Sequence, residues 1–114
     1  MNEDRMDFEF TQLACDADAR RILSLTMNRS FTIKEISDIL DIPISRCYRR
    51  INEMASKGML ISDTLDENRA SLYRCNVRSF QIKLENYGLC VHVEYEDGGE
   101  EDFGYNVNLP AADA

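Results

Sequence analysis

Three arginines lie close together between positions 44 and 57, and the residues around them are polar. The guanidinium group of Arg49 can donate two hydrogen bonds to guanine, and the amide of Asn52 can pair in the same way with adenine. Ser45, Tyr48, Arg46 and Arg50 suit phosphate, which positions a protein on a duplex without reading its sequence. These residue types suit contact with double-stranded DNA if one structural element presents them together.

A helix over about 44–57 would present them on one side. Apolar residues recur at helical spacing through this segment, and polar residues fall opposite them. The apolar face holds Ile44, Cys47, Ile51, Met54 and Ala55, and the polar face holds Ser45, Arg49, Asn52 and Ser56. Gly58 follows as the residue that ends the helix. The sequence thus predicts an amphipathic helix whose outer face carries the candidate DNA contacts.

Two helices are expected before this one. Asp16 is a good N-cap for a helix over 16–27, and Thr32 with Glu35 forms a capping box for a short helix over 33–40. Pro43 separates the short helix from the next one, because the residue before a proline avoids the helical conformation. Residues 6–14 fit helical and strand spacing equally well, and we favour a helix.

After Gly58 the apolar spacing changes to every second residue. Strands over 60–65 and 71–75 around a polar turn over 66–70 predict a hairpin, and Arg69 at its tip is a further candidate for DNA contact. A second hairpin is expected over 80–95. The sequence therefore suggests three parts: a domain over 6–76, a C-terminal hairpin over 77–96, and an acidic, patternless, flexible tail over 97–114.

The order of a helix, a short helix, a tight turn, a third helix and a hairpin resembles a winged helix-turn-helix. The chain is similar to the ArsR-like winged helix superfamily of bacterial and archaeal transcription regulators over about residues 8–76. The matching motifs are Asp16, Arg21-Ile22-Leu23, Thr32, Glu35-Ile36, Leu40-Asp41-Ile42, Gly58-Met59-Leu60 and, loosely, Leu72-Tyr73-Arg74. Ser45 and Arg49 stand where the family usually has polar groups and an arginine facing DNA. The second hairpin looks like an addition found in small archaeal members.

The resemblance implies an α+β fold that is mostly helical, with a three-helix core, a β-hairpin wing and an extra C-terminal β-hairpin. It implies a transcriptional regulator that places the helix over 44–57 in the major groove and has no catalytic activity. We expect a homodimer. Its seam would be either the N-terminal segment (Phe8, Phe10 and Leu13) or the second hairpin (Phe80, Ile82 and Leu84 with Leu89, Val91 and Val93). A lone hairpin with an apolar face needs a partner surface.

Length and composition limit the other functions. With 114 residues the chain suits one domain with at most a small addition, and its single histidine excludes catalysis by several histidines. The four cysteines, at 15, 47, 75 and 90, form no CxxC pair, so we expect no metal and no cofactor. His92 shares a strand face with Cys90 and Glu94, but three ligands on one strand rarely converge on an ion. No apolar run could span a membrane, and no secretory signal is evident, so we expect a cytoplasmic protein.

The net charge of −8 is unevenly distributed. Residues 20–83 hold 12 Lys and Arg against 7 Asp and Glu, whereas both ends are acidic. A mildly basic middle between acidic ends is compatible with a nucleic-acid surface beside acidic segments. Two alternatives stay open: a winged-helix adaptor that binds protein, and a ligand or redox sensor that uses the C-terminal hairpin.

Overall fold

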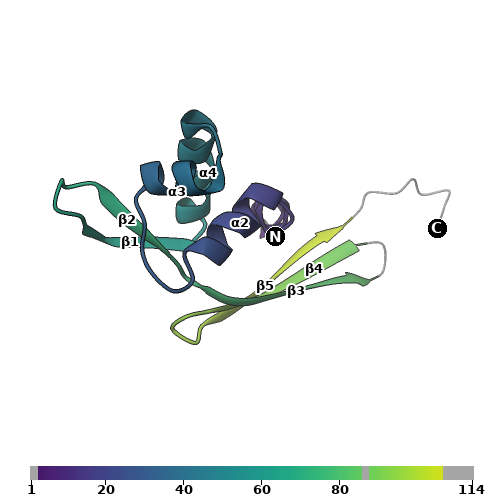
Figure 1. Ribbon diagram of the computed structural model, residues 1–114. Helices are drawn as coiled ribbons and strands as arrows, with labels where there is room; N and C mark the ends of the chain where they lie inside the picture. Colours follow the sequence, from purple (N-terminus) through teal and green to yellow (C-terminus); the bar gives the residue numbers. More distant parts are fainter. Residues whose placement is uncertain (1–2, 86–87, 107–114) are drawn as a thin grey trace. The chain divides into compact units, whose positions relative to one another are not determined.

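The computed structural model describes residues 3–85 and 88–106 and has an α+β fold (Figure 1). The described residues form four helices and two small antiparallel sheets. The elements in chain order are α1 (Glu3–Ala14), α2 (Ala17–Leu25), α3 (Ile33–Leu40), α4 (Ile44–Ser56), β1 (Leu60–Leu65), β2 (Ser71–Cys75), β3 (Val77–Glu85), β4 (Gly88–Tyr95) and β5 (Glu100–Asn106). Strands occupy nearly as many residues as helices, so the expectation of a mostly helical chain was too strong.

The chain forms two compact units. The helical unit, Leu13–Val77, contains α2, α3, α4, β1 and β2. The sheet unit comprises the described residues of 1–12 and 78–114, which supply most of α1 and nearly all of β3, β4 and β5. The boundary differs from the expected domain over 6–76, because the first twelve residues join the C-terminal strands.

Local capping explains where the helices begin and end. The Asp16 side chain accepts a hydrogen bond from the Ala19 amide at 2.9 Å, and Thr32 and Glu35 complete the capping box of α3. Asp41 ends α3 in a left-handed conformation with φ 56°. Gly58, with φ 82°, turns the chain out of α4, and its amide donates to the Ala55 carbonyl at 3.1 Å. The predicted starts and stops of α2, α3 and α4 are therefore confirmed to within about two residues, whereas α1 begins three residues before the predicted position 6.

The core of the helical unit is made by the apolar faces of α2, α3 and α4. Full burial of each large aliphatic side chain stabilises the fold by roughly 1.5–3 kcal/mol. The buried positions include Ala19, Ile22, Leu23, Ile36, Cys47, Ile51 and Met54. Cys47, Ile51 and Met54 among them were predicted from the helical spacing of α4. Ile44 was also expected on this face but is 51% exposed, because it lines the open space beside the β1–β2 hairpin.

The β1–β2 hairpin is confirmed as an antiparallel pair. A register shift interrupts its ladder between Ile61 and Thr64. Phe31, in the segment before α3, forms an antiparallel bridge with Tyr73 through reciprocal backbone hydrogen bonds of 3.0 and 2.8 Å. This bridge ties the chain just before α3 to β2.

The sheet unit has three strands in the order β3-β4-β5, not the two that were expected. β5 pairs with β4 from Gly88↔Asn106 to Glu94↔Glu100. The expectation of a patternless, flexible tail from residue 97 was therefore wrong over 100–106. The acidic residues masked a two-residue period there, in which Phe103 and Tyr105 alternate with polar residues. Residues 107–114 lie outside the described part of the chain.

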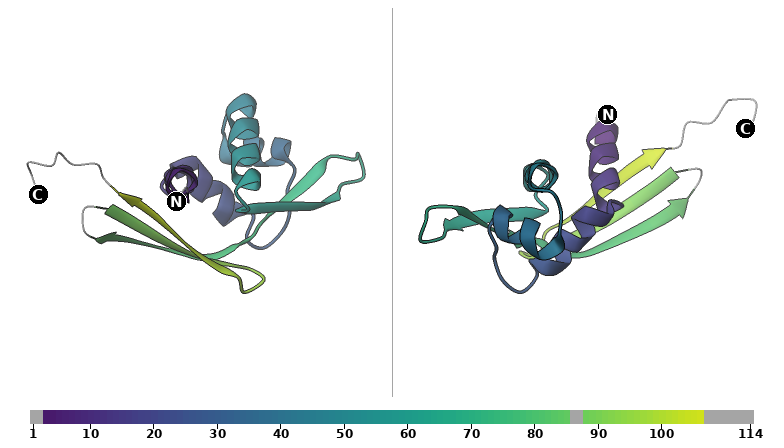
Figure 2. Two further views of the ribbon diagram at one scale, coloured as in Figure 1. Left: turned by 180° about the vertical axis from the view of Figure 1, so that it is seen from behind. Right: turned by 45° about the horizontal axis from the view of Figure 1, so that its top comes forward.

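Helix α1 covers one face of this sheet (Figure 2). Phe10 is 1% exposed, and its ring stacks on Phe103 with the centroids 4.3 Å apart. The Phe80 ring meets Phe10 edge-on at 5.9 Å. Val91 and Val93 are fully buried. Part of the apolar face of the predicted hairpin thus packs within the same chain, whereas Ile82 and Leu84 on that face stay exposed.

Among the described residues, no helix has the length and apolar character needed to cross a membrane.

Candidate nucleic-acid interface

Helix α4 separates apolar and polar side chains on opposite sides. Cys47, Ile51 and Met54 are fully buried. Four of the predicted site residues are exposed on the other side, namely Ser45, Tyr48, Arg49 and Asn52. Arg49 forms no ion pair with any described residue, so its guanidinium group is available to a ligand. The helix therefore presents one free arginine together with hydroxyl and amide groups.

Arg46 and Arg50 are used differently from Arg49. Arg46 Nε lies 3.0 Å from Asp18 Oδ2, and Arg50 Nε lies 3.2 Å from Asp16 Oδ2. Arg50 also contacts Glu53 at 2.7 Å, and its side chain is only 21% exposed. These ion pairs join α4 to the start of α2. Arg50 is thereby held inside the helical unit, whereas Arg46, with a side chain 45% exposed, keeps part of its surface in solvent.

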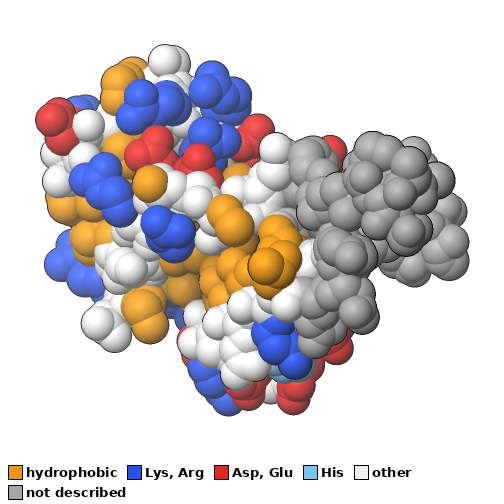
Figure 3. All heavy atoms as spheres, turned by 90° about the vertical axis from the view of Figure 1, so that its right-hand side faces the viewer, with side chains coloured by type: hydrophobic (Ala, Val, Ile, Leu, Met, Phe, Trp, Pro, Cys, Tyr) orange, Lys and Arg blue, Asp and Glu red, His pale blue; other side chains and the backbone are white. Residues whose placement is uncertain are grey.

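The ion pairs of Arg46 and Arg50 determine how charge is distributed over the helices. Figure 3 shows Lys and Arg side chains gathered over the helices, with Asp and Glu side chains among them. Carboxylates at the start of α2 also favour the positive end of that helix dipole. The three arginines of α4 are therefore not one uniform basic patch. The side of α4 that faces away from α2 is the one with an unpaired cation.

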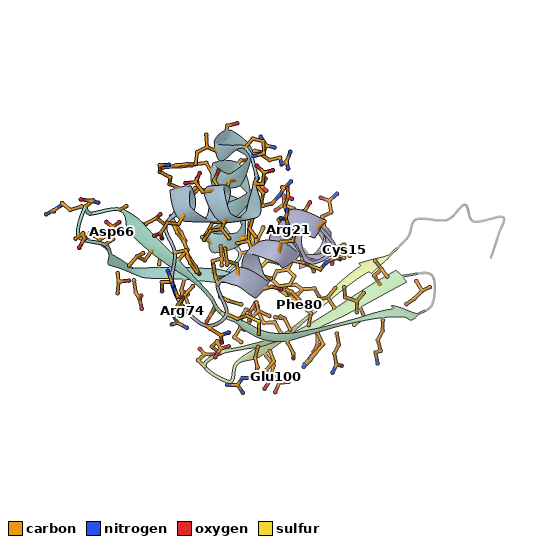
Figure 4. The ribbon with its side chains drawn as sticks, viewed as in Figure 1. Cys15, Arg21, Asp66, Arg74, Phe80 and Glu100 are labelled. Atoms are coloured by element: carbon orange, nitrogen blue, oxygen red, sulfur yellow. The ribbon has the colours of Figure 1, made fainter. Side chains whose placement is uncertain are left out.

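Arg69 lies at the tip of the β1–β2 hairpin and has a left-handed backbone with φ 68°. Asp66 organises this turn, because its Oδ1 atom accepts hydrogen bonds from the amides of Asn68 and Ala70, both at 2.8 Å (Figure 4). The Arg69 amide donates to the Asp66 carbonyl at 2.9 Å. The Arg69 side chain is exposed and forms no ion pair with a described residue. The turn therefore holds a second available cation in a defined place.

A groove of about 860 Å³ separates α3 and the first half of α4 from the hairpin. Tyr48 and Arg69 both line it, so the structure brings these two predicted residues to one surface. Ser45, Arg49 and Asn52 are exposed on α4 outside the residues that line the groove. The groove also contains Ile44 and Lys34, which the sequence reasoning did not select. Ile44 was assigned to the core by its spacing, and its place just after Pro43 was the only local sign of exposure.

Two other places in the chain, around His92 and at Cys47, are poorly suited to bind a metal ion or to act as a redox group. His92 is bound by two carboxylates of β5, with Nδ1 2.7 Å from Asp102 Oδ1 and Nε2 3.0 Å from Glu100 Oε1. The described residues contain no group of three ligands that could hold a metal ion. Burial raises the pKa of the Cys47 thiol, with a further contribution from Asp18. A buried thiol that resists ionisation is a poor redox sensor. Cys47 lies on α4, so this argument does not bear on a sensor in the C-terminal hairpin, where Cys90 is half-buried.

Comparison with protein-family models, with curated proteins and with solved structures gives no match for this chain.

Proposed function

We propose that this chain is a sequence-specific double-stranded DNA-binding transcriptional regulator with a winged helix-turn-helix domain of the ArsR-like kind found in small archaeal regulators. α4 would enter the major groove as the recognition helix, and the β1–β2 hairpin would serve as the wing. The observation that carries the proposal is the division of α4 into a buried face, with Cys47 and Ile51, and an exposed face with Tyr48, Arg49 and Asn52.

Each candidate residue then has a distinct role. Arg49 would pair with guanine and Asn52 with adenine, because their side chains match the edges of those bases. Ser45 and Tyr48 have hydroxyl groups that suit phosphate, and Arg69 on the hairpin would reach phosphate or the minor groove. The structure gives no support to a phosphate contact from Arg50, which is paired with Asp16 and Glu53.

A homodimer on a pseudo-palindromic site is part of the proposal, because two half-sites reinforce each other's affinity. Burial within the chain limits which of the residues named for the dimer seam could contact a second subunit. Phe10, Leu13, Val91 and Val93 are buried within the chain, whereas Ile82 and Leu84 keep 43% and 76% of their surface exposed. Phe8 has no described side chain.

The test is selection of bound sequences from random duplex DNA by the full chain, followed by anisotropy titrations. Arg49→Ala should cost about 1–3 kcal/mol and relax the preference at one base position. Arg46→Ala is the matched variant, because it removes the same charge from the same helix but from the side paired with Asp18. It should weaken all sequences alike and reduce the salt slope by about 1 at most.

Two outcomes would contradict the proposal. One is equal affinity of the wild type and the Arg49→Ala/Arg46→Ala double variant for the selected duplex. The other is an affinity that does not change between low and moderate salt, because phosphate binding weakens steeply as salt rises. Absence of binding to any duplex would favour the adaptor, with the exposed apolar groups of the groove as its protein contact.

A further inference from the structure

The first turn of α4 exposes an apolar side chain that the protein core does not use. Ile44 is 51% exposed, and Tyr48, one turn later on the same side of the helix, is 56% exposed. Both side chains line the groove beside the β1–β2 hairpin. Exposure leaves apolar surface of Ile44 in water, so this part of the side chain contributes little to folding.

The charges around this apolar pair indicate what would cover it. Arg69 lines the same groove and is unpaired with any described residue. The carboxylates of the groove are already engaged: Asp38 lies 3.2 Å from Lys34 Nζ, and Asp66 accepts two backbone hydrogen bonds at the hairpin turn. An apolar contact flanked by a free cation suits a polyanion that carries an exposed apolar group.

Duplex DNA offers one such group in its major groove, the C5-methyl of thymine. Residues at the start of a recognition helix are those that approach base edges most closely. We infer that Ile44, with the ring of Tyr48 beside it, contacts a thymine methyl group and selects thymine at that position of the half-site. This inference rests on the proposed function and deepens it, because it assigns a base preference to a residue that donates no hydrogen bond.

The experiment uses the full chain and the duplex recovered by selection. Each thymine of one half-site is replaced in turn by uracil, which removes the methyl group and leaves the base pair and its hydrogen bonds unchanged. At one or two positions the wild type should lose roughly fourfold in affinity, the value of one buried methyl group. Ile44→Ala should bind thymine and uracil at those positions within about 1.5-fold, since the methyl contact is gone. Ile44→Val, a smaller truncation, should fall between the two.

Ile39→Ala is the matched control, because Ile39 is 54% exposed on α3 but does not line the groove. It should keep both the affinity and the thymine preference of the wild type. Circular dichroism of Ile44→Ala should match the wild type, since the residue lies outside the core.

Three results would overturn the inference while leaving the proposed function intact. They are a selected half-site without thymine, equal binding of thymine and uracil at every position, and a thymine preference that survives in Ile44→Ala. Failure to select any duplex, in contrast, would remove the proposed function itself and the inference with it. The two failures are therefore distinguishable in one series of titrations.

Discussion

The two units of the chain differ sharply in charge. The helical unit, 13–77, holds 10 Lys and Arg against 9 Asp and Glu, whereas residues 1–12 and 78–114 hold 3 against 12. The net charge of the whole chain thus comes from the sheet unit. A total of −8 describes neither unit well, and it does not argue against a polyanion ligand for the helical unit.

The units also differ in what their charges contact. In the helical unit, Asp16 and Asp18 hold two arginines of α4 and leave Arg49 free. In the sheet unit several carboxylates have local partners. Glu94 contacts Arg78 at 3.4 Å, and the Tyr95 hydroxyl donates to Glu101 at 2.6 Å. Ion pairs in both units thus act on the protein itself, whereas Arg49 on α4 and Arg69 at the hairpin tip are exposed and form no ion pair with a described residue.

The largest expected effect tests whether the aromatic contact of α1 holds the sheet unit together. Phe10→Ala should lower the free energy of unfolding by about 3–5 kcal/mol, because it leaves a cavity between Phe80 and Phe103. Urea unfolding followed by circular dichroism measures this loss. Tyr48→Ala is the control, since an exposed aromatic on α4 should change stability by no more than about 0.5 kcal/mol. Similar losses in both variants would mean that Phe10 is not a core residue.

The second prediction concerns the start of α2. Asp16→Ala removes the N-cap hydrogen bond to Ala19 and the ion pair with Arg50, and it should cost about 0.5–2 kcal/mol. Asp16→Asn keeps the cap and removes the charge, so it should cost less than about 1 kcal/mol, the value of a partly exposed pair. Thermal unfolding of both variants separates the two contributions. An equal loss in both would assign the effect to the ion pair rather than the cap.

The features that could be predicted from the sequence are those that depend on residues close together in the chain. The caps at Asp16 and at Thr32 with Glu35, and the buried face of α4, follow from chemistry within a few residues, and the structure confirms them. The sequence did not predict β5, because acidic residues obscure the two-residue period of that strand. It also did not predict the packing of Phe10 on Phe103, because this ring contact joins residues far apart in the chain. The ion pair between Arg46 and Asp18 spans 28 positions and has no local signal either.

The third prediction concerns the hairpin tip. Arg69 adopts φ 68°, which costs an L-residue roughly 1–2 kcal/mol and costs glycine little. Arg69→Gly should therefore raise the free energy of unfolding by up to about 1 kcal/mol, after the entropy cost of glycine is subtracted. The same variant should weaken DNA binding, because the cation is lost. Arg69→Ala keeps the strained backbone and should weaken binding without stabilising the fold. A gain in stability for the alanine variant would contradict strain as the cause.

The smallest expected effect is a pH dependence in the sheet unit. The hydrogen bond with Asp102, together with the nearby Glu100 carboxylate, raises the pKa of His92 above its ordinary value of 6.5. A raised pKa in the folded state means that protonated His92 stabilises β5 fully below about pH 6.5 and that this contribution is lost as pH rises through the folded-state pKa. The melting temperature of the wild type should therefore fall between pH 6 and pH 8 by a small amount, since the pair is solvent-exposed and screened by salt. His92 is the only histidine of the chain, so His92→Gln should remove this slope between pH 6 and pH 8. If the slope persists in His92→Gln, it arises from another titrating group. If the slope of the wild type disappears in 1 M salt, the ion pairs of His92 with β5 are supported as its origin.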